Sequence, residues 1–264
     1  MTVSEPIAVL ALSPQHTSTS ELLADAARAR GLQVHAADEV PAAAQGRCAY
    51  YGGPLFGAKV GDALGLGLLV PPDDFLQSLP RELLGRRVEA VTVAEARRRT
   101  RPFFAKPPSD KSFDAGVFAD GTRLPPLSQL PPETEIQISE IVTFAEEHRL
   151  FLLGGKVHAA SRYARFGRLD VAPATAAALA FGAEVAEAVT GSPLVPSAVV
   201  VDIGLISDPD TGTEHWAVVE ANMAWFAHSY AADADRVLEV VIASAGPVSA
   251  VSDADRRFLA GGRA

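Results

Sequence analysis

Two polar side chains follow an apolar run in the stretch "WAVVEAN", where Glu220 and Asn222 come after residues 216–219. Side chains alternate along a strand, so Glu220 and Asn222 would leave on the same face. Two oxygen donors at a strand end suit a hard cation such as Mg²⁺, which takes its other ligands from phosphates and water. A strand that simply ends in a polar turn would give the same pattern.

A third oxygen donor, Asp202, lies in the apolar stretch "SAVVVDIGLI". The turn "DPDTG" separates this stretch from "WAVVEAN", so a hairpin would bring Asp202 beside Glu220 and Asn222. Asp202 could instead cap a strand end, but a buried carboxylate without a partner is costly, which favours a metal or a cation. The three residues therefore predict a platform for one or two Mg²⁺ ions, with nucleotide phosphates completing the shell.

Cations occur upstream of this pair of strands. Lys106 ends the apolar stretch "FFAK", where it is either a solvated strand terminus or a point charge that reaches a phosphate. The following loop supplies Lys111 and Ser112. The loop is too irregular for a Walker motif, but its backbone N–H groups and second lysine could cover phosphates.

The segment "SEIVTFAEEHR" contains a further set of polar residues. Glu140 falls at a strand end, and Ile141 and Val142 could form an apolar linker. Glu147 and Arg149 are two positions apart, so they share a face if the chain is extended. A hydroxyl acceptor would need a general base, for which Glu147 and the neighbouring His148 are the candidates.

Arg162 and Arg165 follow in "SRYARFG", after a hairpin turn predicted at Gly154 and Gly155. Alternation along the two strands permits Arg149 and Arg162 to share a face. Paired guanidinium groups would suit a planar carboxylate and would stabilise the charge that develops in phosphoryl transfer.

Composition excludes several classes of protein. The 264 residues carry a net charge of −9 with no extended basic tract, which argues against non-specific nucleic-acid binding. Cys48 is the only cysteine, so neither an internal disulfide nor a thiolate metal site can form. The sequence shows no signal-peptide pattern and no stretch as long as a membrane span. We therefore expect a soluble cytoplasmic protein.

The order of expected elements predicts two lobes. "IAVLALS", "TSTSELLADAARARG" and "LQVHAAD" read as strand, helix and strand, a unit that implies a parallel sheet. Residues 1–101 are expected to form this small α/β lobe, which "RVEAVTVAEARRR" closes. The basic run at residues 97–101 is typical of a helix end. Residues 102–264 contain hairpins and predict an antiparallel α+β lobe.

Taken together, the lysine strand, the glutamate linker, the Glu-x-Arg strand, the later arginine, the Asp strand and the Glu-x-Asn strand resemble the ATP-grasp superfamily. The resemblance is greatest to small bacterial ATP-grasp proteins, and it covers nearly the whole chain. It implies an α/β (α+β) ATP-grasp fold with an N-terminal pre-ATP-grasp lobe and antiparallel ATP-binding lobes. The chain is shorter than typical ligases of the superfamily, which leaves less room for a substrate domain.

The resemblance also implies roles for the nucleotide-binding residues. Lys106 would contact the phosphates of ATP, and Lys111 would do so from its loop. Glu140, with the backbone of Ile141 and Val142, resembles the linker that holds adenine between the lobes.

Further roles are implied for the reacting end of the nucleotide. Glu147 resembles the acidic residue near the ribose. Arg149 and Arg162 resemble the catalytic arginines near the γ-phosphate and the acyl-phosphate, and Arg165 would meet a substrate carboxylate or face water. The three oxygen donors Asp202, Glu220 and Asn222 match the Mg²⁺ ligands.

The activity implied is that of an ATP-dependent carboxylate–amine ligase, which acts through an acyl-phosphate and releases ADP and phosphate. Its partners would be small-molecule or peptide carboxylates and amines, with neither nucleic acid nor membrane. A phosphotransferase and a non-catalytic ATP-binding module are the alternatives. The sequence leaves the identity of the substrates open, and also the oligomeric state, a homodimer included.

Overall fold

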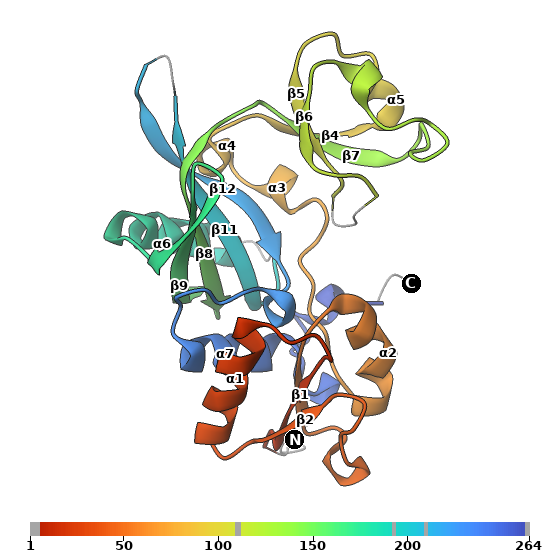
Figure 1. Ribbon diagram of the computed structural model, residues 1–264, viewed down its shortest axis with the longest axis vertical. Coiled ribbons are helices and arrows are strands. Elements are labelled where there is room, and N and C mark those ends of the chain that lie inside the picture. The colour runs from red at the N-terminus through yellow and green to blue at the C-terminus, as the bar shows by residue number, and fades with distance from the viewer. Residues whose placement is uncertain (1–5, 109–111, 192–193, 209–210, 262–264) are drawn as a thin grey trace.

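The computed structural model describes residues 6–108, 112–191, 194–208 and 211–261 (Figure 1). Its strands form three sheets: a three-stranded sheet near the N-terminus, a four-stranded sheet, and a five-stranded sheet. In Figure 1 the four-stranded sheet lies above the five-stranded sheet, and the N-terminal lobe lies below it. The mixed α+β architecture with antiparallel sheets agrees with the fold class expected from the sequence.

The N-terminal lobe is a parallel sheet in the order β2-β1-β3, as the strand–helix–strand pattern predicts. Helix α1 begins after a capping box, in which Thr17 and Ser20 each satisfy a backbone N–H of the other. Its apolar side, which includes Leu23 and Ala27, is buried. The elements of this lobe are β1 (Val9–Leu12), α1 (Ser18–Ala29), β2 (Gln33–Ala36), β3 (Cys48–Tyr51) and α2 (Pro54–Leu64).

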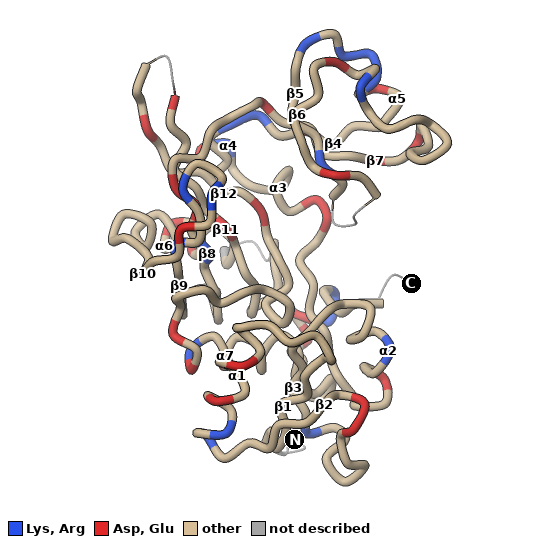
Figure 2. The backbone as a smooth tube through the Cα atoms, viewed as in Figure 1, with Lys and Arg blue, Asp and Glu red and all other residues tan. Residues whose placement is uncertain are grey.

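The four-stranded sheet has the order β4-β7-β5-β6, and all its pairings are antiparallel. Helix α5 ends at Arg97, whose guanidinium donates to the carbonyl oxygen of Leu124, so the basic run begins at a helix end as predicted. Figure 2 shows these basic residues at the outer end of this lobe. The elements are α3 (Phe75–Ser78), α4 (Arg81–Leu84), β4 (Val88–Thr92), α5 (Val93–Ala96), β5 (Phe103–Lys106), β6 (Gly116–Phe118) and β7 (Glu135–Ser139).

The position of β4 differs from the expected division of the chain at residue 101. The stretch expected to close the first lobe pairs instead with β7, in register from Val88↔Ser139 to Thr92↔Glu135. An alternating apolar strand has the same sequence pattern whichever sheet it joins, so the pattern could not identify its partner. The expected boundary therefore cuts through the lobe that contains the four-stranded sheet.

The five-stranded sheet has the order β10-β9-β8-β11-β12 and is antiparallel throughout. Its elements, with the two long helices that accompany it, are β8 (Phe144–Leu153), β9 (Lys156–Arg165), β10 (Arg168–Pro173), α6 (Ala176–Gly191), β11 (Ala198–Ser207), β12 (Glu214–Asn222) and α7 (Ala234–Ser244). Single-turn 3₁₀ segments complete the described chain at Ala42–Ala44, Gly121–Arg123, Ala224–Phe226, Val248–Ala250 and Arg256–Phe258.

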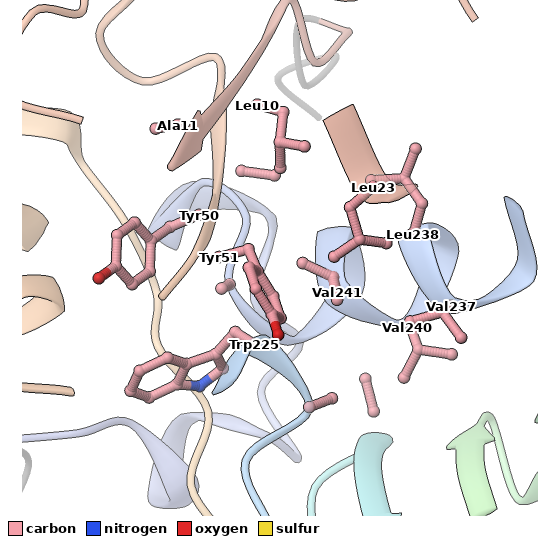
Figure 3. Close-up of a cluster of buried hydrophobic side chains, with 14 of the residues drawn as sticks. Leu10, Ala11, Leu23, Tyr50, Tyr51, Trp225, Val237, Leu238, Val240 and Val241 are labelled. Atoms are coloured by element: carbon pink, nitrogen blue, oxygen red, sulfur yellow. The ribbon is translucent and has the colours of Figure 1, made fainter. Parts of the chain in front are cut away.

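The two faces of the five-stranded sheet have different partners. One face packs Leu150, Val201 and their neighbours against α6 and the short helix α3. At one end of the other face, Phe151 and Val200 join a core shared with α7 and the N-terminal lobe. Figure 3 shows part of this core, where the indole N–H of Trp225 donates to the carbonyl oxygen of Leu69 at 2.7 Å. The remainder of this second face carries the polar residues of the candidate site.

Candidate functional site

The oxygen donors predicted from the sequence meet on the central strands of the five-stranded sheet. The register pairs Asp202 with Glu220 across β11 and β12, and pairs Asp202 with Arg149 across β11 and β8. Arg149 donates two hydrogen bonds to Asp202, from Nε at 2.9 Å and from Nη2 at 2.8 Å. The Asn222 amide nitrogen donates to Glu220 at 3.0 Å and to Asp202 at 3.3 Å. The cluster is therefore connected through three adjacent strands.

Lys106 joins this cluster from the opposing sheet. It lies at the end of β5, and its Nζ is 2.9 Å from Glu220 Oε2. Lys106 is therefore a cation held between the four-stranded and five-stranded sheets. Lys111, the second lysine expected at the phosphates, lies outside the described residues.

Burial and charge oppose each other in this cluster. The Asp202 side chain is 1 % exposed, and burial raises the pKa of its carboxyl while the Arg149 guanidinium opposes that rise. Burial also acts to raise the pKa of Glu220. Lys106 and the Asn222 amide outweigh it and hold the pKa of Glu220 below its usual value. The structure thus places two carboxylates together with two cations in a poorly solvated region.

A cavity of about 300 Å³ lies between the two sheets, beside this cluster. Its walls are mainly apolar, and Lys106, Glu147 and Glu220 mark its polar side. The other lining residues are Leu76, Arg86, Val88, Phe104, Ala115, Val117, Gln137, Ile138, Ser139, Glu140, Ile141, Val142, Phe144 and Val219. An apolar slot with a few polar groups at one side is typical of a small-molecule site.

The predicted linker residues Glu140, Ile141 and Val142 connect β7 with β8 and border this cavity. The Glu140 carboxylate accepts a hydrogen bond from the backbone N–H of Arg87 at 2.8 Å. The same two residues also form a backbone hydrogen bond, from the N–H of Glu140 to the carbonyl oxygen of Arg87, at 3.2 Å. The Glu140 side chain thus fixes the linker to the start of β4.

Glu147 also lines the cavity, on the same face of the sheet as Arg149. Tyr163 donates its hydroxyl to Glu147 Oε2 at 2.9 Å. Burial raises the pKa of Glu147, and the charges of Asp202 and Glu220 raise it further.

Two tyrosines that the sequence did not single out enclose Arg149. The rings of Tyr163 and Tyr230 stack with centroids 5.3 Å apart, and the Arg149 guanidinium lies 5.4 Å from each centroid. Tyr230 has a φ of 51°, which is uncommon for a residue other than glycine. Nothing local in "SRYARFG" distinguishes Tyr163 from an ordinary strand residue, so its position could not be predicted from spacing.

The prediction that Arg149 and Arg162 share a face is wrong. Counting from the Gly154–Gly155 turn assumes an unbroken register, but the β8–β9 pairing shifts by one residue between Phe151 and Leu152. A shift of one residue exchanges the two faces for every residue beyond it. Arg149 therefore pairs with Ser161, and Arg162 points to the opposite face.

On that opposite face, Arg162 pairs in register with His148. The Arg162 Nη2 is 3.3 Å from Asp170 Oδ1, and its Nη1 is 3.9 Å from Glu146 Oε1. Arg165 also lies near Glu146, at 3.5 Å. The His148 side chain is fully buried, so it is not brought to the cavity either. The structure thus assembles one of the two predicted catalytic arginines.

The donor set fits a magnesium ion that is bound together with a nucleotide. Among the described residues, no group of three or more His, Cys, Asp or Glu side chains could hold a metal by itself. Asp202 and Glu220 offer two carboxylates, and Asn222 is hydrogen-bonded to both. Mg²⁺ uses one or two carboxylates and completes its shell with water and phosphate oxygens, so a small protein donor set is what it requires.

Two facing antiparallel sheets, with a slot between them and a lysine, an arginine and paired carboxylates at its side, define the ATP-grasp class of proteins to which the sequence is similar. A sequence model of the ATP-grasp domain, family 2 of its clade, matches residues 83–240, more than half of the chain. The chain belongs to this ATP-grasp family.

Solved structures show the same fold. A RimK domain protein ATP-grasp from Sphaerobacter thermophilus DSM 20745 is 15% identical with a TM-score of 0.53, and the match covers 89% of this chain and 100% of that one. The ATP-grasp ligase PsnB complexed with minimal precursor is 13% identical with a TM-score of 0.51, covering 91% and 100%. PsnB complexed with precursor peptide PsnA2 and AMPPNP is 14% identical with a TM-score of 0.50, covering 92% and 99%. At these identities the likeness concerns the fold alone.

Curated proteins yield no match to this sequence. In the described part of the chain, none of the helices has the length and apolar character that a membrane crossing requires.

Proposed function

We propose that this protein is an ATP-dependent carboxylate–amine ligase. The observation that carries the proposal is the convergence of Asp202, Glu220 and Asn222 with Lys106 and Arg149 beside a cavity between two antiparallel sheets. This arrangement offers charged groups for phosphates at one side and an apolar slot for a base at the other.

In this proposal the adenine occupies the slot, next to the linker formed by Glu140, Ile141 and Val142. Lys106 reaches the phosphates from the end of β5, and Glu147 lies near the ribose. The short segment between β7 and β8 therefore sets the depth at which the base can enter.

Asp202, Glu220 and Asn222 would hold Mg²⁺ with the phosphates, and the ion would supply neutralisation of the charge on the transferring phosphoryl group. Arg149 is held by Asp202 and by the faces of two tyrosines, so its permanent charge is fixed beside the phosphate end of the site. A carboxylate acceptor and the acyl-phosphate made from it are anions, and Arg149 is suited to hold either.

The reaction proceeds in two steps. An oxygen of the substrate carboxylate attacks the γ-phosphorus of ATP, the bond from that phosphorus to the β-phosphate oxygen breaks, and ADP leaves. The amine nitrogen then attacks the carbonyl carbon of the acyl-phosphate, phosphate leaves, and the nitrogen releases a proton to solvent. No protein nucleophile is consumed, in agreement with the burial of Cys48 in the N-terminal lobe.

Peptides belong among the candidate substrates, as do free amino acids and other small acids. PsnB, which shares the fold, is an ATP-grasp ligase found in complex with a precursor peptide. We propose that the acid and the amine of this protein are small molecules or peptide termini.

Hydroxylamine trapping tests the proposal. The protein is incubated with ATP, Mg²⁺ and pools of carboxylic acids, and hydroxylamine replaces the unknown amine. We expect one pool to give a hydroxamate and ADP in equal amounts. A phosphorylated alcohol without any hydroxamate would identify a phosphotransferase, and nucleotide binding without turnover in any pool would identify a binding module.

A further inference from the structure

The cavity between the sheets is lined by one buried side chain that the proposed chemistry does not use. Gln137 lies on β7 in register with Lys106, and its side chain is buried at 4% exposure. Its amide nitrogen donates to the carbonyl oxygen of Asp73 at 2.8 Å and lies 3.4 Å from Gln77 Oε1. Its oxygen, Oε1, is buried and has no hydrogen-bond partner in the part of the chain that the structure describes.

The orientation of this amide follows from its partners. A backbone carbonyl can only accept, so the atom of Gln137 that faces the Asp73 carbonyl must be the nitrogen. The remaining atom is therefore an acceptor. A buried acceptor without a donor costs free energy, and such a group is normally satisfied by water or by a ligand.

The cavity supplies no donor for this oxygen from its cations. Arg86 lines the same cavity, but its Nη1 donates to the carbonyl oxygens of Leu84 and Val218, and its Nη2 donates to that of Val219. Lys106 is engaged with Glu220. The remaining walls are mainly apolar side chains. A flat ligand in this slot therefore meets an acceptor at Gln137, and it gains most if it carries a donor there.

We propose that Gln137 is the residue that reads the nucleobase, by accepting a hydrogen bond from the 6-amino group of adenine. A 6-oxo purine would place its oxygen against Gln137 Oε1, and a purine without a 6-substituent would leave that oxygen unpaired. Both losses select for adenine. This inference rests on the proposed function, because it assumes that a nucleotide base occupies the slot.

A ligand series with the unaltered protein gives the first test. Dissociation constants are measured by calorimetry, with Mg²⁺ and without acid or amine, for ATP, for purine riboside triphosphate and for inosine triphosphate. We expect ATP to bind about tenfold more tightly than purine riboside triphosphate, as the loss of one buried hydrogen bond implies. Inosine triphosphate should bind more weakly still.

Variants then assign the effect to Gln137. Gln137→Met has a similar volume and no acceptor, and it should bind ATP and purine riboside triphosphate within about twofold of each other. Its affinity for purine riboside triphosphate should match that of the unaltered protein, which also shows that it is folded. If the methionine variant does not fold, Gln137→Asn withdraws the acceptor by one methylene, and it should reduce the preference to less than about threefold. Gln77→Met is the matched control on α3, and it should keep the full preference.

The outcomes separate this inference from the proposed function. Equal binding of ATP and purine riboside triphosphate by the unaltered protein would overturn the role of Gln137 and leave the nucleotide site standing. A full preference retained in Gln137→Met or in Gln137→Asn would overturn it too. Binding of none of these triphosphates would instead contradict the proposed function itself.

Discussion

At the scale of single residues, the ion pair between Arg149 and Asp202 has the greatest influence on the site. Both side chains are largely removed from water, at 12% and 1% exposure. Removing one partner of such a pair leaves the other charge buried, which is more costly than the pair was favourable. Substitutions here therefore have to separate an effect on folding from an effect on chemistry.

Asp202→Asn keeps the volume of the side chain and an acceptor for Arg149 but removes one negative charge. We expect the unfolding midpoint to remain high enough for assay, while ATP turnover falls at least about a hundredfold, because the carboxylate is a proposed ligand of the phosphate-bound cation. Asp202→Ala should in addition lower the free energy of unfolding by about 3 kcal/mol or more. Asp253→Asn, at a fully exposed side chain, is the control. Normal turnover in Asp202→Asn would show that the proposed metal ligands are misassigned.

Residue spacing along strands predicted the oxygen donors well, because Asp202, Glu220 and Asn222 depend on one hairpin and on alternation. It failed for Arg162, because the face of a strand depends on the register, and a bulge changes the register without any clear signal in the sequence. Gln137 could not have been found either, because its significance arises from a hydrogen bond that it lacks.

At the scale of elements, the site depends on the close approach of β11 to the start of β8. A Cβ on Gly204 would lie 2.3 Å from Cδ1 of Phe144, and Phe144 lines the cavity. Glycine at this position therefore allows the aromatic ring to form the wall of the slot.

Gly204→Ala should push the Phe144 ring toward the cavity. We expect the affinity for ATP to fall about tenfold and the free energy of unfolding to fall by about 1–3 kcal/mol, which is typical of overpacking. Calorimetric binding and chemical denaturation measure the two effects. Gly116→Ala is a control on β6, where an added Cβ meets nothing within 4 Å. Unchanged ATP affinity in a folded Gly204→Ala protein would show that this wall does not contact the base.

Element types were easier to predict than element partners. The parallel unit of β1, α1 and β2 is local, so periodicity and caps were sufficient to identify it. The partner of β4 is β7, more than forty residues later, and a strand pattern contains no information about so distant a choice.

At the scale of the whole molecule, the C-terminal part of the chain ties the N-terminal lobe to the five-stranded sheet. Arg30, at the end of α1, is 2.8 Å from Glu239 of α7, and the same carboxylate is 2.5 Å from His158 of β9. Leu69 forms an isolated bridge with Leu259. These long-range contacts lie beyond what local sequence patterns can predict.

The network around Glu239 should make stability depend on pH. Hydrogen bonds from Arg30 and His158 hold the pKa of Glu239 below its usual value of 4.5. A carboxylate with a lowered folded pKa stabilises the protein above its unfolded pKa, and this contribution is lost as the pH falls through the folded value. Glu239→Gln should therefore lower the melting temperature at pH 7, and the difference from the unaltered protein should shrink below about pH 4.5. Glu184→Gln, on exposed α6 surface, is the control, and a difference that grows on acidification would contradict the assignment.

Binding of the nucleotide between the two sheets should stabilise the molecule as a whole. Mg²⁺ and ATP at a hundred times the dissociation constant should add about 2.7 kcal/mol to the free energy of unfolding. Lys106→Ala should reduce the resulting rise in melting temperature, while Lys59→Ala on exposed α2 surface should not. An equal rise in all three proteins would remove Lys106 from the phosphate site.

The most direct test of the proposed ligase chemistry follows an oxygen atom. Once hydroxylamine trapping has identified an acid, that acid is labelled with ¹⁸O in its carboxylate and incubated with ATP, Mg²⁺ and amines. The phosphate released is then examined by ³¹P NMR. If the carboxylate attacks the γ-phosphorus and the amine displaces phosphate, one ¹⁸O must appear in the phosphate. Phosphate free of label, formed while the amide product accumulates, would contradict an acyl-phosphate intermediate and with it the central claim.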